Sequence, residues 1–170
     1  MKIIEGLKKV KDLTKKVEDL HIKIEKAAAD TELDTPLYSD QRTKVSAWLQ
    51  AVHDILLEIE LLKYRIQKTN ILTDVVIELG NKNITKSISQ WIMRRQLYAS
   101  QEKKAWQQLT DRGLQTQAAR SSNTSDVKYY KVRRYFDPEE RDKMVSLYDS
   151  EPSIIDGKLE IINAITDLLE

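Results

Sequence analysis

The chain has 170 residues, with 28 Lys and Arg against 27 Asp and Glu, and it contains no cysteine. A net charge of +1 argues against a dedicated polyanion binder, and the lack of cysteine excludes disulfides, thiolate metal sites and cysteine nucleophiles. Only four glycines and three prolines accompany 32% charged residues, which is typical of long solvated helices. We therefore expect a mainly α fold in a single domain over residues 1–170.

The first two predicted elements are helices over about 3–28 and 41–70. Apolar side chains recur there every three or four residues, which is the period of an amphipathic helix. Leu49 and Leu56 broaden the apolar face of the second helix. The intervening residues, 30–40, contain Pro36 and several residues typical of caps and loops. A short loop between two such helices predicts an antiparallel helical hairpin.

A small β element is predicted next. Residues 74–79 are rich in β-branched side chains and end at Gly80-Asn81, which indicates a strand and a tight turn. A helix over about 84–112 follows. Residues 127–136 are again dense in β-forming side chains. Because an isolated strand is not stable, we expect 74–79 and 127–136 to pair, and the helical hairpins to form a bundle around this element.

The third helix has its own end signals, since Asn83 or Thr85 can cap its start and Gly113 suits its C-terminus. The last helix is predicted to begin at Asp137-Pro138 and to run over about 138–169. Pro152 lies inside it and lacks the backbone N–H that a helix needs, so we expect a kink or split near 149–152.

Two segments, 70–76 and 163–169, resemble one another. Both contain Asn, Thr and Asp at matching positions and apolar residues elsewhere, and both end a long amphipathic helix. The matching residues form a helix-end motif of Asn70, Thr73, Asp74, Asn163, Thr166 and Asp167. Thr and Asp can bond frayed backbone groups at helix ends, so chance or shared end chemistry explains the match. A duplicated hairpin whose ends lie side by side is the other explanation.

The chain from about residue 60 onward resembles a family of small bacterial and phage proteins called septicolysin-like. The matching positions are Ile66, Thr69, Asn70 and Thr73, then Gly80, Ile84, Thr85, Ser87 and Ile88, then Arg94, Arg95, Val127 and Lys128, and finally Ile155, Asp156, Lys158, Asn163 and Thr166. The chain departs from the family pattern at Ala164, where a Trp is usual, and at Pro152. The resemblance implies a mostly helical, self-associating protein, and the family label implies a cytolysin.

No catalytic chemistry is predicted. The chain has no phosphate-binding glycine loop, no Gly-x-Ser-x-Gly, no His-Glu-x-x-His and no EF-hand loop. Glu18-x-x-His21 has the spacing of a di-iron ligand pair, but such sites need a second motif of this kind. We expect no enzyme, no cofactor and no metal site.

The apolar faces of the first two helices exceed what one thin bundle can hide, which predicts a non-enzymatic structural or interaction protein. We expect it to act as a homo-oligomeric subunit that contacts itself and other proteins, with a phage particle as one setting. The predicted partner contacts are Trp48, Tyr64, Trp91, Tyr98, Trp106, Lys128, Arg133 and Arg134.

Two alternatives stay open. The family label implies a membrane-active protein, although the sequence shows no apolar run of spanning length. The basic strand 127–136, which interleaves Lys and Arg with aromatic residues, implies a nucleic-acid-binding module. Without a signal-peptide pattern we expect a cytoplasmic or virion protein.

Overall fold

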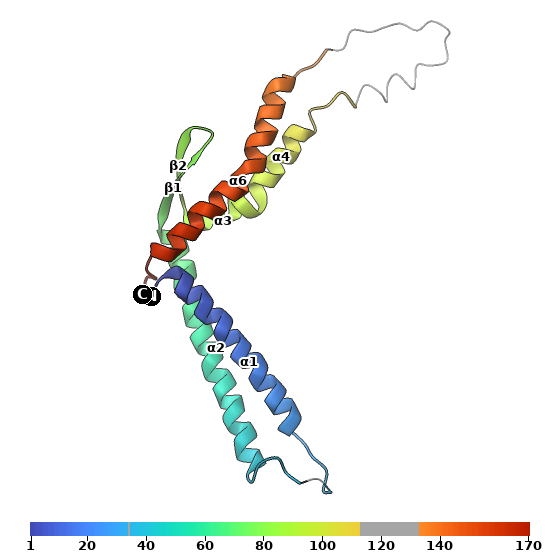
Figure 1. The fold of residues 1–170 in the computed structure, drawn as a ribbon, viewed down its shortest axis with the longest axis vertical. Helices are drawn as coiled ribbons and strands as arrows, with labels where there is room; N and C mark the ends of the chain where they lie inside the picture. The colour runs from blue at the N-terminus through green and yellow to red at the C-terminus, as the bar shows by residue number, and fades with distance from the viewer. Residues whose placement is uncertain (34, 113–132) are drawn as a thin grey trace, which may run out of the picture. The chain divides into compact units, whose positions relative to one another are not determined.

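The computed structural model describes residues 1–33, 35–112 and 133–170 of a mainly helical protein (Figure 1). Helical hairpins accompany one two-stranded antiparallel sheet, which confirms the predicted fold class. Where the sequence suggested one domain, the chain divides into two compact units. Unit 1 comprises Met1–Thr73 and Glu160–Glu170, and unit 2 comprises Asp74–Leu159.

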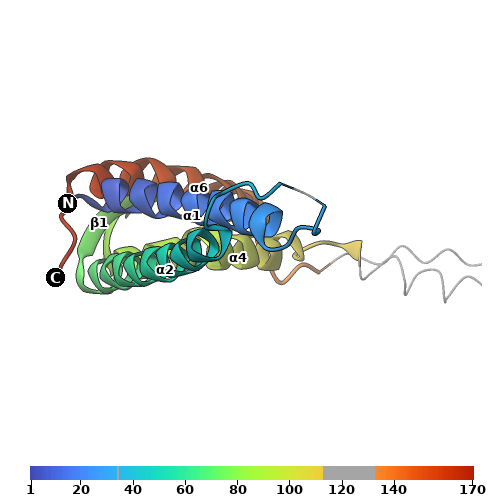
Figure 2. The ribbon, with the colours of Figure 1, turned by 90° about the horizontal axis from the view of Figure 1, so that it is seen from below.

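Unit 1 is built on the predicted hairpin of α1 (Ile3–Ala27) and α2 (Gln41–Leu72). The two helices lie side by side in Figures 1 and 2. Their core is a cluster of four buried side chains, two from each helix: Leu13, Val17, Ile59 and Leu62. The Asp40 carboxylate accepts a hydrogen bond from the Thr43 N–H at 3.0 Å and so caps α2.

Unit 2 begins with a β-hairpin of β1 (Asp74–Leu79) and β2 (Lys82–Ser87). β1 pairs with β2, a strand that was not predicted, in a register that matches Asp74 to Ser87. Residues 127–132 lie outside the described residues, and 133–136 form no strand.

The turn explains the strand β2. Gly80 and Asn81 have φ values of 56° and 63°, the left-handed conformation that a two-residue hairpin turn requires at both positions. A turn of this type returns the chain directly along β1, so residues 82–87 become a strand. The following helix is capped by Ser87, whose hydroxyl accepts from the Gln90 N–H at 3.3 Å, and not by the predicted Asn83 or Thr85.

The third helical segment runs without a break through α3 (Ile88–Met93), the π-helix η1 (Arg94–Tyr98) and α4 (Ala99–Gln107). It starts later and ends earlier than the predicted 84–112, and the predicted cap Gly113 lies outside the described residues. In η1 the Ala99 N–H bonds the Arg94 carbonyl five residues earlier, which inserts one residue into the turn.

The last helix, α6, spans Pro138–Ile165 and is not split at Pro152. It starts where predicted, and the Asp137 carboxylate accepts from the Glu139 N–H at 2.9 Å. A proline inside a helix costs about 3 kcal/mol. The helix tolerates this cost because Glu151 and Ile155, on either side of Pro152, are anchored by burial, at 2% and 0% exposed.

Candidate functional site

The apolar side chains of α2 form two faces on opposite sides of the helix. One face holds Ile59, Leu62 and Ile66, which are buried, and its first two members pack in the core with α1. At 3.6 residues per turn, most of a second group lies on the opposite side, and its remaining member, Leu56, lies on the flank between the two faces. We call this group the outer face of α2: Leu56, Leu57, Leu61, Tyr64, Ile71 and Leu72.

The outer face is uncovered within the chain as the structure describes it. Its six side chains are between 49% and 63% exposed, and Leu49, two turns before Leu56, is 55% exposed. Single exposed apolar residues are ordinary on a protein surface, whereas a group on one helix, four of whose members lie within residues 56–64, is typical of an interaction surface. The sequence pointed to part of this surface through Tyr64 and through the broad face that contains Leu49 and Leu56.

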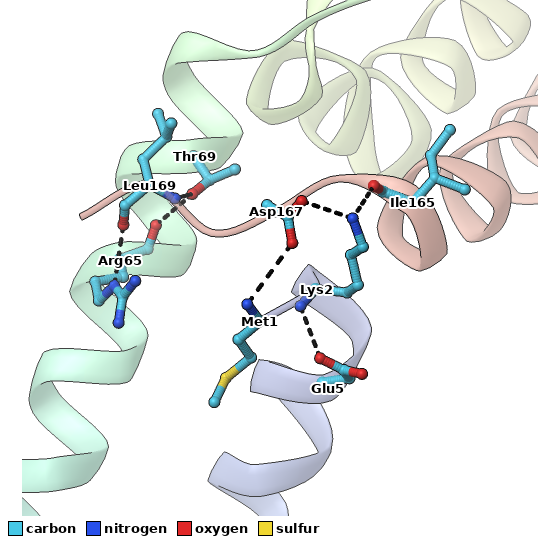
Figure 3. A network of polar contacts seen from close by, with 8 residues as sticks. All are labelled: Met1, Lys2, Glu5, Arg65, Thr69, Ile165, Asp167 and Leu169. Atoms are coloured by element: carbon cyan, nitrogen blue, oxygen red, sulfur yellow. Dashed lines mark hydrogen bonds and ion pairs between the residues drawn. The ribbon is translucent and has the colours of Figure 1, made fainter.

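A second feature of unit 1 is a polar network that joins the two ends of the chain to the hairpin (Figure 3). Lys2 and Asp167 form a β-bridge, and the Lys2 ammonium donates to the Asp167 carboxylate at 2.6 Å and to the Ile165 carbonyl at 2.8 Å. The hydrogen bond from Lys2 lowers the pKa of Asp167. We call Lys2, Thr69, Asp167 and Leu169 the terminal clasp.

Thr69 completes the terminal clasp from α2. Its fully buried hydroxyl accepts from the Leu169 N–H at 2.9 Å and donates to the Arg65 carbonyl at 2.7 Å. Arg65 in turn donates from Nε to the Leu169 carbonyl at 3.0 Å. Between these bonds Leu168 is buried over Gly6, where a Cβ would lie only 2.9 Å from the Leu168 Cδ1. The terminal clasp therefore fixes the end of the chain on the α1–α2 hairpin and serves the fold.

The two similar segments, 70–76 and 163–169, have the same local structure. Thr73 follows the last residue of α2 and Thr166 the last residue of α6, and each donates its N–H to the carbonyl four residues earlier, at 3.0 and 2.9 Å. The order of exposed, half-buried and buried residues is identical along both segments. Asn70 differs in one respect, since its buried Oδ1 has no hydrogen-bond partner among the described residues.

The equivalence extends to the partners of both segments. Asp74 pairs with Ser87, and Asp167 pairs with Lys2, and each partner is the N-cap of a helix. In both caps the backbone N–H is bonded by the side chain three residues later, at 2.8 Å for Lys2 and 3.0 Å for Ser87. The two segments therefore share their local hydrogen bonds, which both common helix-end chemistry and a duplicated helical hairpin explain.

Unit 2 contains a buried ionic cluster that the sequence did not reveal. Arg94 in η1 donates to Glu151 in α6, Nε to Oε2 at 2.9 Å and Nη2 to Oε1 at 3.0 Å, and its Nη1 lies 3.3 Å from Glu102. The Glu151 side chain is 3% exposed. The Arg94 guanidinium carbon also lies 5.9 Å from the ring centre of Tyr148. The cluster holds the helical segment 88–107 against α6.

The cluster is electrostatically satisfied. Burial would lower the pKa of Arg94, but its bonds to Glu151 and Glu102 outweigh this and raise the pKa. Burial would likewise raise the pKa of Glu102, yet the hydrogen bonds from Tyr148 and Arg94 lower it. Burial and the bond to Glu102 raise the pKa of Tyr148. Arg94 bonds both carboxylates, which fits a structural role in unit 2.

An open cavity of about 680 Å³ adjoins this cluster in unit 2. Leu79 and Ile84 of the β-hairpin line it together with Leu147 of α6, and Arg94 and Glu151 form part of its wall. Arg94 and Glu151 are bonded to each other, so a ligand in the cavity would contact either charge only by breaking the cluster.

The structure separates the predicted aromatic contacts. Tyr64 and Tyr98 are 60% and 49% exposed. Trp48 is half-buried and packs edge-on against Tyr38, with ring centres 5.5 Å apart, and Trp106 is also half-buried. Trp91 is fully buried and donates from Nε1 to the Val75 carbonyl at 2.9 Å, so it belongs to the core of unit 2 and not to a partner contact.

The predicted basic contacts give a similar division. Arg134 forms a two-point ion pair with Asp111, with Nη2 2.6 Å from Oδ2, which lowers the pKa of Asp111. Arg133 is exposed, and Lys128 lies outside the described residues. Within the described ranges, no group of three His, Asp or Glu side chains is placed to hold a metal ion, and no helix is long and apolar enough to cross a membrane.

The comparisons with known proteins concern the fold. No protein-family model and no curated protein sequence matches the chain. The chain is similar to the crystal structure of a functionally unknown conserved protein from Corynebacterium diphtheriae, with 20% sequence identity, a TM-score of 0.59 and 99% of each chain covered. At this identity the likeness shows a shared, mainly helical fold along the whole chain.

Proposed function

We propose that the protein is a non-enzymatic structural or interaction protein that associates with further copies of itself through the outer face of α2. One observation carries this proposal: α2 has two opposed apolar faces, and α1 covers only one of them. A helix that is apolar on both sides is normally enclosed by other helices. Burying the outer face against another helix would remove this apolar surface from water.

A second copy of this chain is the occupant that the charge supports best. With a net charge of +1, two copies repel one another only weakly as they approach. The surface next to the outer face also carries both signs of charge, with Glu60 and Lys63 one turn apart. A patch of mixed sign is able to pair with itself, whereas a patch of one sign is not.

Co-purification of a tagged and an untagged copy tests the proposal. We expect the untagged wild-type chain to be retained by the tagged wild-type chain, and retention to be lost when both carry Leu57→Gln and Leu61→Gln. These side chains are 52% and 58% exposed, so folding should change little. Leu33→Gln is the matched control, because Leu33 is 97% exposed outside the helices. Equal retention of all three forms would contradict the proposal.

A further inference from the structure

We infer that two copies pair through antiparallel α2 helices, with the two-fold axis beside Leu61. This inference rests on the proposed self-association and adds its geometry. In a two-fold interface each residue meets a partner residue in reverse order along the helix. The order of side chains on α2 is therefore able to discriminate an antiparallel from a parallel arrangement.

The charges that flank the outer face reverse their sign about its middle. Asp54 and Glu60 lie before Leu61, and Lys63 and Lys68 lie after it. In an antiparallel pair centred beside Leu61, Glu60 of one copy meets Lys63 of the other, and Asp54 meets Lys68. Both pairings are self-complementary, since Glu60 and Lys63 lie on one edge of the apolar face, and Asp54 lies on the other edge with Lys68 just inside it.

A parallel pair would not form these contacts. Its two-fold axis runs along the helices, so each charge lies level with its own copy but on the opposite edge of the interface, and neither Glu60 and Lys63 nor Asp54 and Lys68 are brought together. Glu60 and Lys63 are exposed and take part in no ion pair among the described residues, so they are available to a partner. Asp54 accepts a hydrogen bond from Gln50 at 2.8 Å and Lys68 bonds the backbone oxygen of Glu170, contacts that leave both at the surface of α2.

The apolar side chains fit the same arrangement. Tyr64 of one copy meets Leu57 and Leu61 of the other across the axis. At the ends of the interface Leu49 of one copy lies on the same edge as Ile71 of the other, and within about a turn of the position opposite it. All of these side chains are more than half exposed in the single chain. The pairing would therefore bury apolar surface of α2 that α1 leaves exposed.

Single-cysteine cross-linking tests the inference, because the native chain has no cysteine. Leu61→Cys lies at the axis and should form a disulfide between two copies under mild oxidation. Leu49→Cys alone should not, because the two cysteines would be about 37 Å apart at 1.5 Å per residue. A mixture of Leu49→Cys and Ile71→Cys copies should form a disulfide between one copy of each kind, because Leu49 and Ile71 lie on the same edge of the face.

Charge reversal supplies the second measurement. Glu60→Lys and Lys63→Glu should each weaken the dimer roughly tenfold, because each replaces two attractive contacts by two repulsive ones. The double variant, which exchanges the two charges, should restore the wild-type dissociation constant.

The outcomes separate the geometry from the association itself. A dimer in which Leu49→Cys cross-links with itself would overturn the antiparallel arrangement and leave self-association standing. A dimer in which Leu61→Cys forms no disulfide would overturn the position of the axis. A chain that stays monomeric overturns both the geometry and the proposed function.

Discussion

Arg94 and Glu151 form a two-point ion pair, 57 residues apart in the chain, with both donor–acceptor distances near 3 Å. The pair is almost closed to solvent on the Glu151 side, and Glu102 binds the remaining edge of the guanidinium. A buried carboxylate that loses its cation is costly, whereas the intact pair contributes little net stability over an apolar replacement.

Arg94→Met should therefore destabilise the protein by about 3–5 kcal/mol, because it leaves Glu151 buried and unpaired. Arg95 is the matched control, since its ion pair with Asp156 is more exposed and Arg95→Met should cost about 1 kcal/mol or less. Urea unfolding at one protein concentration measures the loss of stability in both variants. The double variant Arg94→Met/Glu151→Met should recover most of the loss, and similar costs for Arg94→Met and Arg95→Met would refute a structural role for the cluster.

Thr69→Val should destabilise the protein by about 1–3 kcal/mol, because the Leu169 N–H loses its acceptor inside the terminal clasp. Thr14 is a suitable control, since its hydroxyl also donates to a carbonyl one turn earlier, at 2.8 Å, but lies on an exposed helix face. Urea unfolding gives the loss of unfolding free energy for Thr69→Val and for Thr14→Val. The difference between the two losses is the contribution of the bond to Leu169. No difference would mean that the terminal clasp adds nothing to stability.

Two glycines inside helices should respond differently to alanine. A Cβ at Gly157 meets open space among the described residues, so Gly157→Ala should stabilise α6 by about 0.5–1 kcal/mol. At Gly6 the same gain is opposed by the contact with Leu168, which must move from its buried position. Gly6→Ala should therefore stabilise less than Gly157→Ala in thermal unfolding, or should destabilise. A gain at Gly6 as large as that at Gly157 would show that Leu168 is loosely packed.

The terminal clasp should also weaken in acid. The hydrogen bond from Lys2 lowers the pKa of Asp167 below its ordinary value of 3.8. A lowered carboxyl pKa contributes stability above the ordinary value, and this contribution is lost as the pH falls through the pKa of the folded state. The wild type should therefore melt at a higher temperature than Asp167→Asn at neutral pH. This difference in melting temperature should disappear below pH 3.8.

The same melting series with Asp74→Asn serves as a control, because Asp74 occupies the equivalent place at the end of α2 and belongs to none of the ion pairs described. The gap to wild type should change more with pH for Asp167→Asn than for Asp74→Asn. A gap for Asp167→Asn that does not change with pH would rule out the Lys2 bond as the source of the acid effect.

Local signals predicted most helix boundaries and one strand. Residues 74–79 form β1 as expected, α2 begins at Gln41, and α6 begins at Pro138 after its Asp cap. Each of these follows from side chains within a few residues of the boundary. The missed strand β2 also had a local signal, since Gly80-Asn81 suits a two-residue turn between paired strands, and this signal outweighs the capping potential of Asn83 and Thr85.

The long-range contacts could not be predicted in the same way. Arg94 meets Glu151, and Thr69 meets the backbone of Leu169, which lies 100 positions later in the chain. Nothing near either residue in the sequence specifies the partner, because hydrogen bonds across such separations depend on how whole elements pack. The repeated segments 70–76 and 163–169 were the one sequence feature that pointed to long-range organisation.

The solution mass of the wild-type chain tests self-association through α2 most directly. Light scattering over a concentration series should give a mass that rises from 19.8 kDa toward a multiple of that value, and the Leu57→Gln/Leu61→Gln variant should remain at 19.8 kDa. A wild-type mass that stays at 19.8 kDa at every concentration would contradict the proposed function.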